Sequence, residues 1–233
     1  MAPKGLILLV LFAACPAVAN TIVITGVDTA VGYLNSLWIY DNGTNSQVYF
    51  AGGIDVTVDG YSRLLYCVDL DTNINVPGTY STTIDFTDSA ALQRVGWLMQ
   101  NYWPSAIYTG AALQVHGAAF QLAIWDIITD NGDGFGTTTT HAGKVSQSTN
   151  TSHTTDSAVL AAAILYETES VGKSSNYGVV YHNTSSGTTV QTLMGPTVTD
   201  NGPSPIPEPS AIILIFSGLA LIGLSRLRRN SLR

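Results

Sequence analysis

A cysteine and a glutamine, each inside an apolar stretch, are residues of this chain whose types permit covalent chemistry. Cys67 lies in the strand-like run LLYCVDL (residues 64–70), and Gln121 lies in FQLAIWD (residues 120–126). A thiolate is a nucleophile, and a primary carboxamide is an electrophile that can expel ammonia. If the fold holds the two side chains in contact, the Cys67 sulfur can attack the Gln121 carbonyl and form an internal thioester.

Cys67 has no expected disulfide partner, because the other cysteine, Cys15, lies in a segment that we expect to be removed on export. A free thiol in an exported protein tends to oxidise or to pair with another molecule, and a thioester would mask it. The alternative is a buried, inert cysteine, since cysteine packs as a small hydrophobic residue. Gln121 is then a core amide whose hydrogen bonds are satisfied.

The motifs YCVD (residues 66–69) and QLAIW (residues 121–125) together resemble the Cys–Gln thioester domain (TED) of bacterial surface adhesins. In that family an aromatic-Cys-aliphatic-Asp strand faces a Gln-x-Ala-Ile-Trp helix. The resemblance implies an internal Cys67–Gln121 thioester that an amine on a target opens, which links Gln121 covalently to the target. Such a reaction occurs once and without turnover, so an enzyme is not expected. Phe120 departs from the Thr that usually precedes the glutamine.

Five further residues are candidates for supporting roles around this pair: Tyr66, Asp69, His116, Trp125 and Asp126. Trp125 follows Gln121 by one helical turn and is expected to shield the thioester from water. We expect the oxyanion to be stabilised where the strand faces the start of the helix. His116 precedes Gln121 by five positions and can reach the pair only if the helix breaks at Gly117. Gln114 is a competing amide without the Ala-Ile-Trp context.

Two other kinds of site are possible. Cys67, His116 and Asp126 would make a cysteine hydrolase, although no known cysteine-hydrolase signature surrounds Cys67. The segment TDNGDG (residues 129–134) is similar to a calcium loop, but it lacks an acidic residue at the first and twelfth ligand positions and is interpreted as a helix-ending turn. No cofactor or metal is expected, since metal spacing is lacking among the four histidines: His116, His141, His153 and His182.

Both ends of the chain carry export signals. Lys4, an apolar run (residues 5–15) and small residues before Asn20 predict a secretory signal peptide over residues 1–19. A loose lipobox at residues 12–15 is an alternative that would lipidate Cys15.

PEPS (residues 207–210), an apolar run (residues 211–224) and four arginines at the end of the chain resemble the PEP-CTERM sorting signal. The resemblance implies an exosortase-type enzyme that processes residues 207–233, with transient membrane anchoring by the C-terminal helix. It also implies export across the inner membrane to a cell surface or extracellular matrix, with extracellular polysaccharide as a possible partner. The apolar run is short of the about 20 residues that span a bilayer, and a plain C-terminal anchor is the alternative.

Outside these signals the chain is strongly acidic. Between Asn20 and Asp200 it carries fifteen acidic residues against four basic ones: Arg63, Arg94, Lys144 and Lys173. This charge excludes nucleic acid as a partner and disfavours anionic membrane surfaces. The leading hypothesis is therefore an exported adhesion protein. A non-covalent structural protein of a matrix or biofilm and a secreted cysteine hydrolase are the alternatives.

The pattern of elements predicts one α+β domain over residues 20–196, an antiparallel β-sandwich or barrel with an inserted helical subdomain. Strands are expected at residues 21–27, 33–40, 46–53, 54–58, 64–70, 177–183 and 188–195, with hairpin turns at residues 41–43 and 59–60. Helices are expected at residues 88–103, 110–131 and 156–170. Residues 134–152 are predicted to be a long loop and residues 197–209 a linker.

Overall fold

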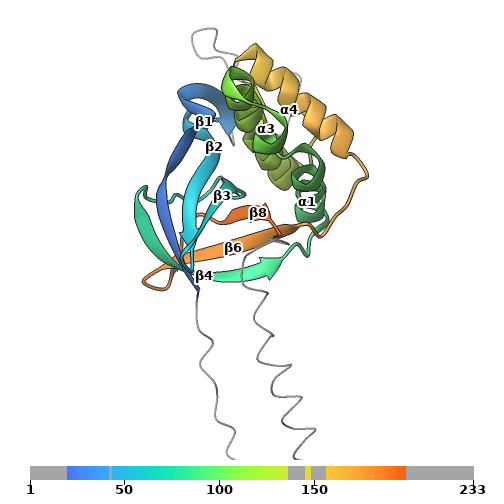
Figure 1. Cartoon of the computed structure of the whole chain (residues 1–233). Coiled ribbons are helices and arrows are strands. Elements are labelled where there is room, and N and C mark those ends of the chain that lie inside the picture. Colours follow the sequence, from blue (N-terminus) through green and yellow to red (C-terminus); the bar gives the residue numbers. More distant parts are fainter. Residues whose placement is uncertain (1–19, 42–43, 136–144, 148–155, 198–233) are drawn as a thin grey trace, which may run out of the picture. The chain divides into compact units, whose positions relative to one another are not determined.

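The computed structural model describes residues 20–41, 44–135, 145–147 and 156–197. The predicted signal peptide, the PEP motif and the C-terminal helix lie outside these residues, as does most of the predicted linker. Across the described residues, six antiparallel strands close a barrel in the order β1-β2-β3-β8-β6-β4-β1 (Figure 1). The strands are β1 (Asn20–Asp41), β2 (Thr44–Val58), β3 (Tyr61–Cys67), β4 (Gly78–Phe86), β6 (Gly178–Ser185) and β8 (Leu193–Pro196). The predicted α+β class with a barrel is confirmed.

The first strands are longer and fewer than the sequence predicts. The four runs predicted between residues 21 and 58 form two long strands, β1 and β2, which pair with register shifts rather than separating into short hairpins. The predicted turn at Asp59–Gly60 is confirmed, with φ of 49° and 88° in the left-handed region that such a turn requires. It joins Val58 of β2 to Tyr61 of β3.

Three other stretches were predicted differently. Strand β4 was not predicted as a separate run, because its sequence GTYSTTIDF is mostly polar and buries alternate residues only in part. The predicted loop at residues 134–152 contains a short strand, β5 (Val145–Gln147), which pairs with β1. The run at residues 188–195 divides into β7 (Thr188–Thr189), which pairs with β6, and β8.

Three helices begin and end close to where the sequence predicts, and a short fourth helix that begins at Pro104 was not predicted. They are α1 (Ala90–Tyr102), α2 (Pro104–Ile107), α3 (Gly110–Asp130) and α4 (Ser157–Ser170). Ser89 accepts from the Leu92 amide and caps α1, and Asp156 accepts from the amides of Ala158 and Val159 and caps α4. Asn131 ends α3 in the left-handed conformation, with φ of 63°.

Helix α3 is the central element of the core. It contacts β1, β2, β3 and α4, and α1, α3 and α4 lie together on one side of the barrel (Figure 1). Its length and composition alone would let it span a membrane, but most of its apolar window is buried inside the domain. Gly117 allows the closest approach, since a Cβ there would lie 2.3 Å from the Val31 carbonyl oxygen of β1. One side of α3 is thus pressed directly against the barrel backbone.

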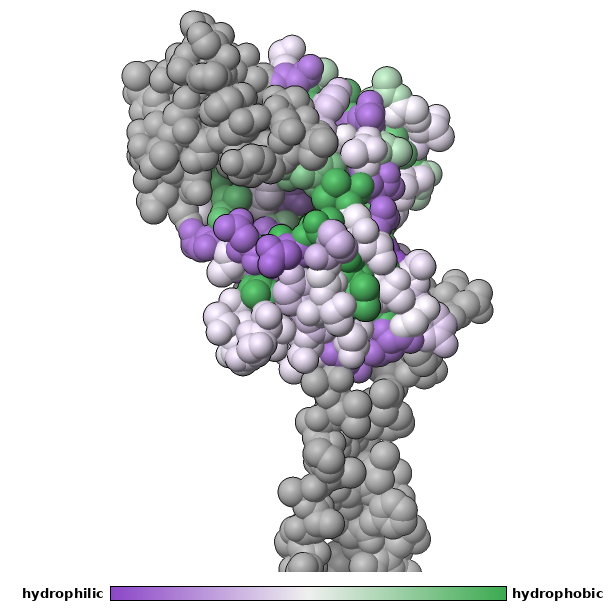
Figure 2. All heavy atoms as spheres, turned by 90° about the vertical axis from the view of Figure 1, so that its left-hand side faces the viewer, coloured by the Kyte–Doolittle hydropathy of each residue, from purple (hydrophilic) through white to green (hydrophobic). Residues whose placement is uncertain are grey.

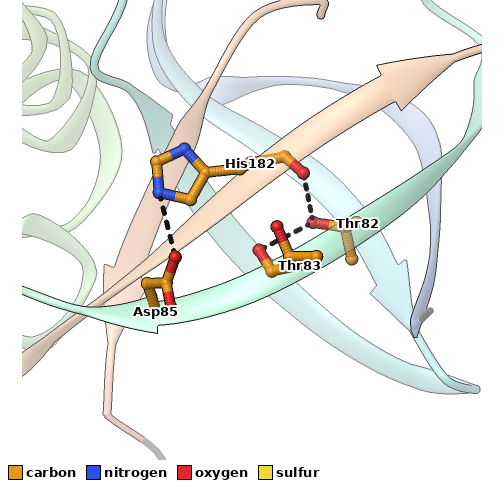
Figure 3. A network of polar contacts seen from close by, with 4 residues as sticks. All are labelled: Thr82, Thr83, Asp85 and His182. Atoms are coloured by element: carbon orange, nitrogen blue, oxygen red, sulfur yellow. Dashed lines mark hydrogen bonds and ion pairs between the residues drawn. The ribbon is translucent and has the colours of Figure 1, made fainter. Parts of the chain in front are cut away.

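Pale and hydrophilic residues predominate on one face of the molecule (Figure 2). On the face shown in Figure 2, the hydrophobic residues form small separate groups rather than one continuous patch. On the outside of β4 and β6, Asp85 and His182 point toward one another, with 3.5 Å between Oδ2 and Nε2 (Figure 3). Both side chains are well exposed, at 69% and 47%.

Because exposed ion pairs are screened by water, His182→Ala is expected to change the free energy of unfolding by less than about 0.5 kcal/mol. Urea denaturation of the variant and the parent protein checks this. A loss several times larger would mean that the pair has a structural role that its exposure does not indicate.

Candidate functional site

The fold brings Cys67 and Gln121 into direct contact, although they lie on different elements. Cys67 is the last residue of β3, and Gln121 lies in the second half of α3. The Cys67 backbone N–H donates to Gln121 Oε1 at 2.9 Å, and Gln121 Nε2 donates to the Cys67 carbonyl oxygen at 2.6 Å. These two hydrogen bonds fix the carboxamide of Gln121 against the residue that carries the thiol.

The end of β3 explains why the Cys67 backbone is free to make this contact. Cys67 still pairs with Leu193 of β8, but the pairing of β3 with β2 ends at Leu65, so the other edge of Cys67 is open to Gln121. The Cys67 thiol donates to the Asp69 carbonyl oxygen at 2.9 Å, and its sulfur accepts from the Asp69 amide at 3.4 Å. The carboxylate of Asp69 instead accepts from the Asp71 amide and the Thr72 hydroxyl, and it holds the turn that follows the strand.

Both side chains of the pair are shielded from water. The exposed fractions of Cys67 and Gln121 are 2% and 1%. Burial raises the pKa of the Cys67 thiol to about 12, against the opposing effects of the Trp125 indole and the Asp69 backbone amide. The thiol is therefore protonated near neutral pH, and its attack on the amide must be coupled to loss of the S–H proton.

Trp125 lies on the same face of α3 as Gln121, one turn further along, and it is 5% exposed. Its indole N–H interacts with the Cys67 sulfur and acts to lower the thiol pKa. Nε1 is buried, and no acceptor lies within ordinary hydrogen-bond geometry. The indole N–H is therefore a buried donor near the Cys67 sulfur that makes no ordinary hydrogen bond.

Trp125→Phe keeps an aromatic cover but removes this donor. We expect formation of a Cys67–Gln121 bond to become several-fold slower, equivalent to about 1 kcal/mol, with about 1 kcal/mol lost from stability through the smaller ring. The check is a time course of intact mass on freshly synthesised protein. An unchanged rate would limit Trp125 to a packing role.

The comparisons with known proteins agree with this geometry. Residues 64–170 match the family model of the thioester domain. The matched segment contains Cys67 and Gln121, covers less than half of the chain, and runs from within β3 to the last residue of α4. Thioester domains attach covalently to targets by reaction with amines. No curated protein and no solved structure matches the chain.

An aromatic cluster includes the residues that precede Cys67 and Gln121 in the chain, Tyr66 and Phe120. Tyr66 is fully buried and packs edge-to-face on Trp103 and Phe120, with ring centroids 5.4 and 5.0 Å apart. Trp103, which follows α1, and Phe120 also contact each other. Sequence reasoning singled out Tyr66 but missed Trp103, and it treated Phe120 only as a departure from the family pattern. The sequence feature that could have indicated this cluster is the aromatic residue directly before each member of the pair: Tyr66 before Cys67 and Phe120 before Gln121.

His116 lies away from the Cys67–Gln121 pair. Helix α3 runs unbroken through Gly117, so the break that His116 would need does not occur. Its ring stacks on Tyr108, with centroids 3.6 Å apart, and its Nδ1 lies 2.7 Å from the Tyr166 hydroxyl. Burial lowers the pKa of His116. These partners place it in an aromatic contact between α3 and α4.

Asp126 also faces away from Cys67. Its Oδ2 accepts from the Gly134 amide at 3.1 Å, and its carboxyl interacts with that of Glu167 on α4. Burial raises the pKa of both carboxyls, and their mutual repulsion raises that of Glu167 further. Cys67, His116 and Asp126 therefore do not form the hydrolase triad.

The donor that can stabilise the oxyanion was not predicted. Gln121 lies well inside α3 rather than at its start, so the N-terminal amides of the helix do not face its carbonyl. The Cys67 N–H, which already donates to Gln121 Oε1, takes this position instead. Its role depends on the end of β3 lying against the middle of α3. This contact cannot be predicted from the spacing of the residues in the sequence.

Proposed function

We propose that this protein attaches covalently to amines through an internal thioester between the Cys67 sulfur and the side-chain carbonyl carbon of Gln121. The observation that carries the proposal is the reciprocal hydrogen bonding between the Gln121 carboxamide and the Cys67 backbone, inside a water-excluded site. This contact orients the electrophile against the nucleophile and supplies an oxyanion donor at the same time.

In the forming step, the sulfur bonds to the Gln121 carbonyl carbon and the bond from that carbon to Nε2 breaks. The S–H proton goes to the departing nitrogen, which leaves as ammonia. The Cys67 carbonyl oxygen holds the leaving nitrogen through its hydrogen bond. The products are one thioester and one ammonia, and neither a cofactor nor an oxidant is required.

In the attachment step, a primary amine attacks the thioester carbonyl. A new amide bond forms between the amine nitrogen and Gln121, the bond to sulfur breaks, and the amine proton returns to the Cys67 thiolate. The raised pKa of this thiol favours its protonation and opposes the reverse reaction. The protein acts once and is not an enzyme in this proposal.

The proposal places this chemistry at a cell surface or in an extracellular matrix. Its support is in the sequence: the predicted signal peptide at residues 1–19 and the resemblance of residues 207–233 to a PEP-CTERM signal for an exosortase-type enzyme. The surface target carries amines, and extracellular polysaccharide is the expected surrounding. Adhesion follows because a covalent bond to a surface amine does not dissociate.

The first test is the intact mass of the purified protein beside its Cys67→Ala variant, with the termini assigned by digestion. We expect the native protein to be lighter than its sequence by one ammonia and Cys67→Ala to match its sequence. Methylamine should then add to Gln121 and free one thiol.

Glutamate in place of Gln121 would identify a thioester that formed and was hydrolysed. An intact Gln121 beside a free Cys67 in fresh, undenatured protein would overturn the proposal and favour the non-covalent matrix protein.

A further inference from the structure

The turn that follows β3 holds the Cys67 sulfur, and a residue far along the chain holds that turn. Strand β8 lies beside β3 and pairs Leu193 with Cys67 (Figure 1). Because the two strands are antiparallel, moving two residues beyond Cys67 on one side corresponds to moving two residues back from Leu193 on the other. Gln191 therefore lies opposite Asp69, the residue whose backbone contacts the sulfur.

Gln191 donates to the same backbone oxygen as the thiol. The carbonyl oxygen of Asp69 accepts from the Cys67 thiol at 2.9 Å and from Gln191 Nε2 at 3.3 Å. The Asp69 amide in turn donates to the Cys67 sulfur at 3.4 Å. Both backbone groups of Asp69 thus hold the sulfur, and the Gln191 side chain fixes one of them.

Gln191 is itself anchored by its neighbours in the barrel. Its backbone carbonyl accepts at 2.8 Å from Nδ2 of Asn183, a fully buried residue of β6. The next carbonyl oxygen, that of Thr192, accepts from the Val68 amide at 3.0 Å. These bonds tie Gln191 to β6 on one side and to the turn after β3 on the other, so its partly buried side chain is held in place.

This support lies outside the segment that matches the thioester-domain family. The match ends at residue 170, whereas Gln191 and Asn183 belong to the part of the chain that closes the barrel after α4. The matched segment carries the thiol and the carboxamide, but the residue that fixes the acceptor of the thiol comes from the closing strands.

We propose that Gln191 is a positioning residue that acts on the Cys67 sulfur through the Asp69 carbonyl and aligns it for attack on Gln121. This inference rests on the proposed function and adds a residue to its forming step. When the S–H proton leaves with the departing ammonia, the Asp69 carbonyl loses one donor and its partial negative charge faces the sulfur. The Gln191 N–H still donates to this oxygen and weakens that repulsion. Gln191 keeps its own protons throughout.

The test compares two substitutions of Gln191 with a control in the same connection between β3 and β4. Gln191→Met keeps the length of the side chain but removes the donor. Gln191→Glu keeps the shape and places a negative charge beside the Asp69 carbonyl. Tyr80→Phe is the control, because the Tyr80 hydroxyl bonds to the amide and the carbonyl of Asn75, at 2.8 and 3.1 Å, away from the sulfur.

The loss of one ammonia is followed by intact mass on freshly synthesised protein, and stability is measured by urea denaturation. We expect the loss to be about fivefold slower in Gln191→Met, as for one lost hydrogen bond, and slower again in Gln191→Glu. Tyr80→Phe should react at the rate of the parent protein although it is also less stable. Packing alone would spare the isosteric Gln191→Glu, so a faster reaction in this variant than in Gln191→Met would overturn the proposal. Equal rates in Gln191→Met and the parent protein would overturn it as well.

The infrared S–H band of Cys67 separates a failure of this proposal from a failure of the proposed function. If the parent protein never loses ammonia, the proposed function fails, but the thiol stays free and its S–H band reports the bond to Asp69 directly. Gln191→Met is then expected to shift or broaden this band, and Tyr80→Phe to leave it unchanged. A band that is the same in Gln191→Met and the parent protein would overturn the positioning role of Gln191.

Discussion

Replacing Gln121 with alanine is expected to abolish amine capture completely and to destabilise the domain by about 2–4 kcal/mol. The loss of capture follows because alanine has no carbonyl carbon for the Cys67 sulfur to attack. The loss of stability follows because the backbone N–H and C=O of Cys67 lose their Gln121 partners in a site that water does not reach. Methylamine addition by intact mass and urea denaturation measure the two effects.

The matched control is Gln114→Ala. Gln114 lies on the same helix, and its Nε2 donates to the Thr29 carbonyl at 2.8 Å in a more exposed position. This variant should capture amines as the parent protein does and lose no more than about 1.5 kcal/mol. Amine capture that survives Gln121→Ala, or that disappears in Gln114→Ala, would move the acyl donor to another residue.

Adding one methyl group at Gly117 is expected to destabilise the protein by about 2 kcal/mol and to lower the yield of thioester. A Cβ at this position would lie 2.3 Å from the Val31 carbonyl oxygen and 2.6 Å from its carbon, and backbone atoms cannot rotate away. The helix must therefore move outward from the barrel. Gln121 lies one turn further along α3 and would move with it, away from Cys67.

Gly26→Ala in β1 is the control for Gly117→Ala. No atom lies within 4 Å of a Cβ built on Gly26, and its φ is not in the left-handed region. It should change stability by less than about 1 kcal/mol. Urea denaturation and the fraction of molecules lighter by one ammonia are measured for both variants. A stable Gly117→Ala protein with full thioester yield would show that α3 can shift without separating the pair.

The features that the sequence predicted well are those that neighbouring residues determine. The caps at Ser89 and Asp156, the left-handed Asn131 and the turn at Asp59–Gly60 each follow from the chemistry of a few adjacent residues. The Cys67–Gln121 pair was also singled out from the sequence, because a thiol and a carboxamide in apolar segments are conspicuous when no disulfide partner is expected, and the structure places the two residues in contact. Residue type alone specified which chemistry was available.

The tertiary structure decided what surrounds the pair. Strand β4 was overlooked because its polar sequence becomes a barrel strand only when β1 and β6 pair with it on either side. His116 and Asp126 were candidates because they lie near Gln121 in sequence, but an unbroken α3 turns them toward α4 instead.

The oxyanion donor and the Trp103 contact likewise depend on segments that lie far apart in the chain. Their positions depend on closure of the barrel and on the distance between α3 and the barrel. That distance is short at Gly117, which packs against the backbone of Val31. Local patterns carry no information about such distances, since they arise only when distant segments pack together. The sequence by itself therefore determined which groups are available for the proposed reaction, and the packing of α3 on the barrel determined their contact and their burial.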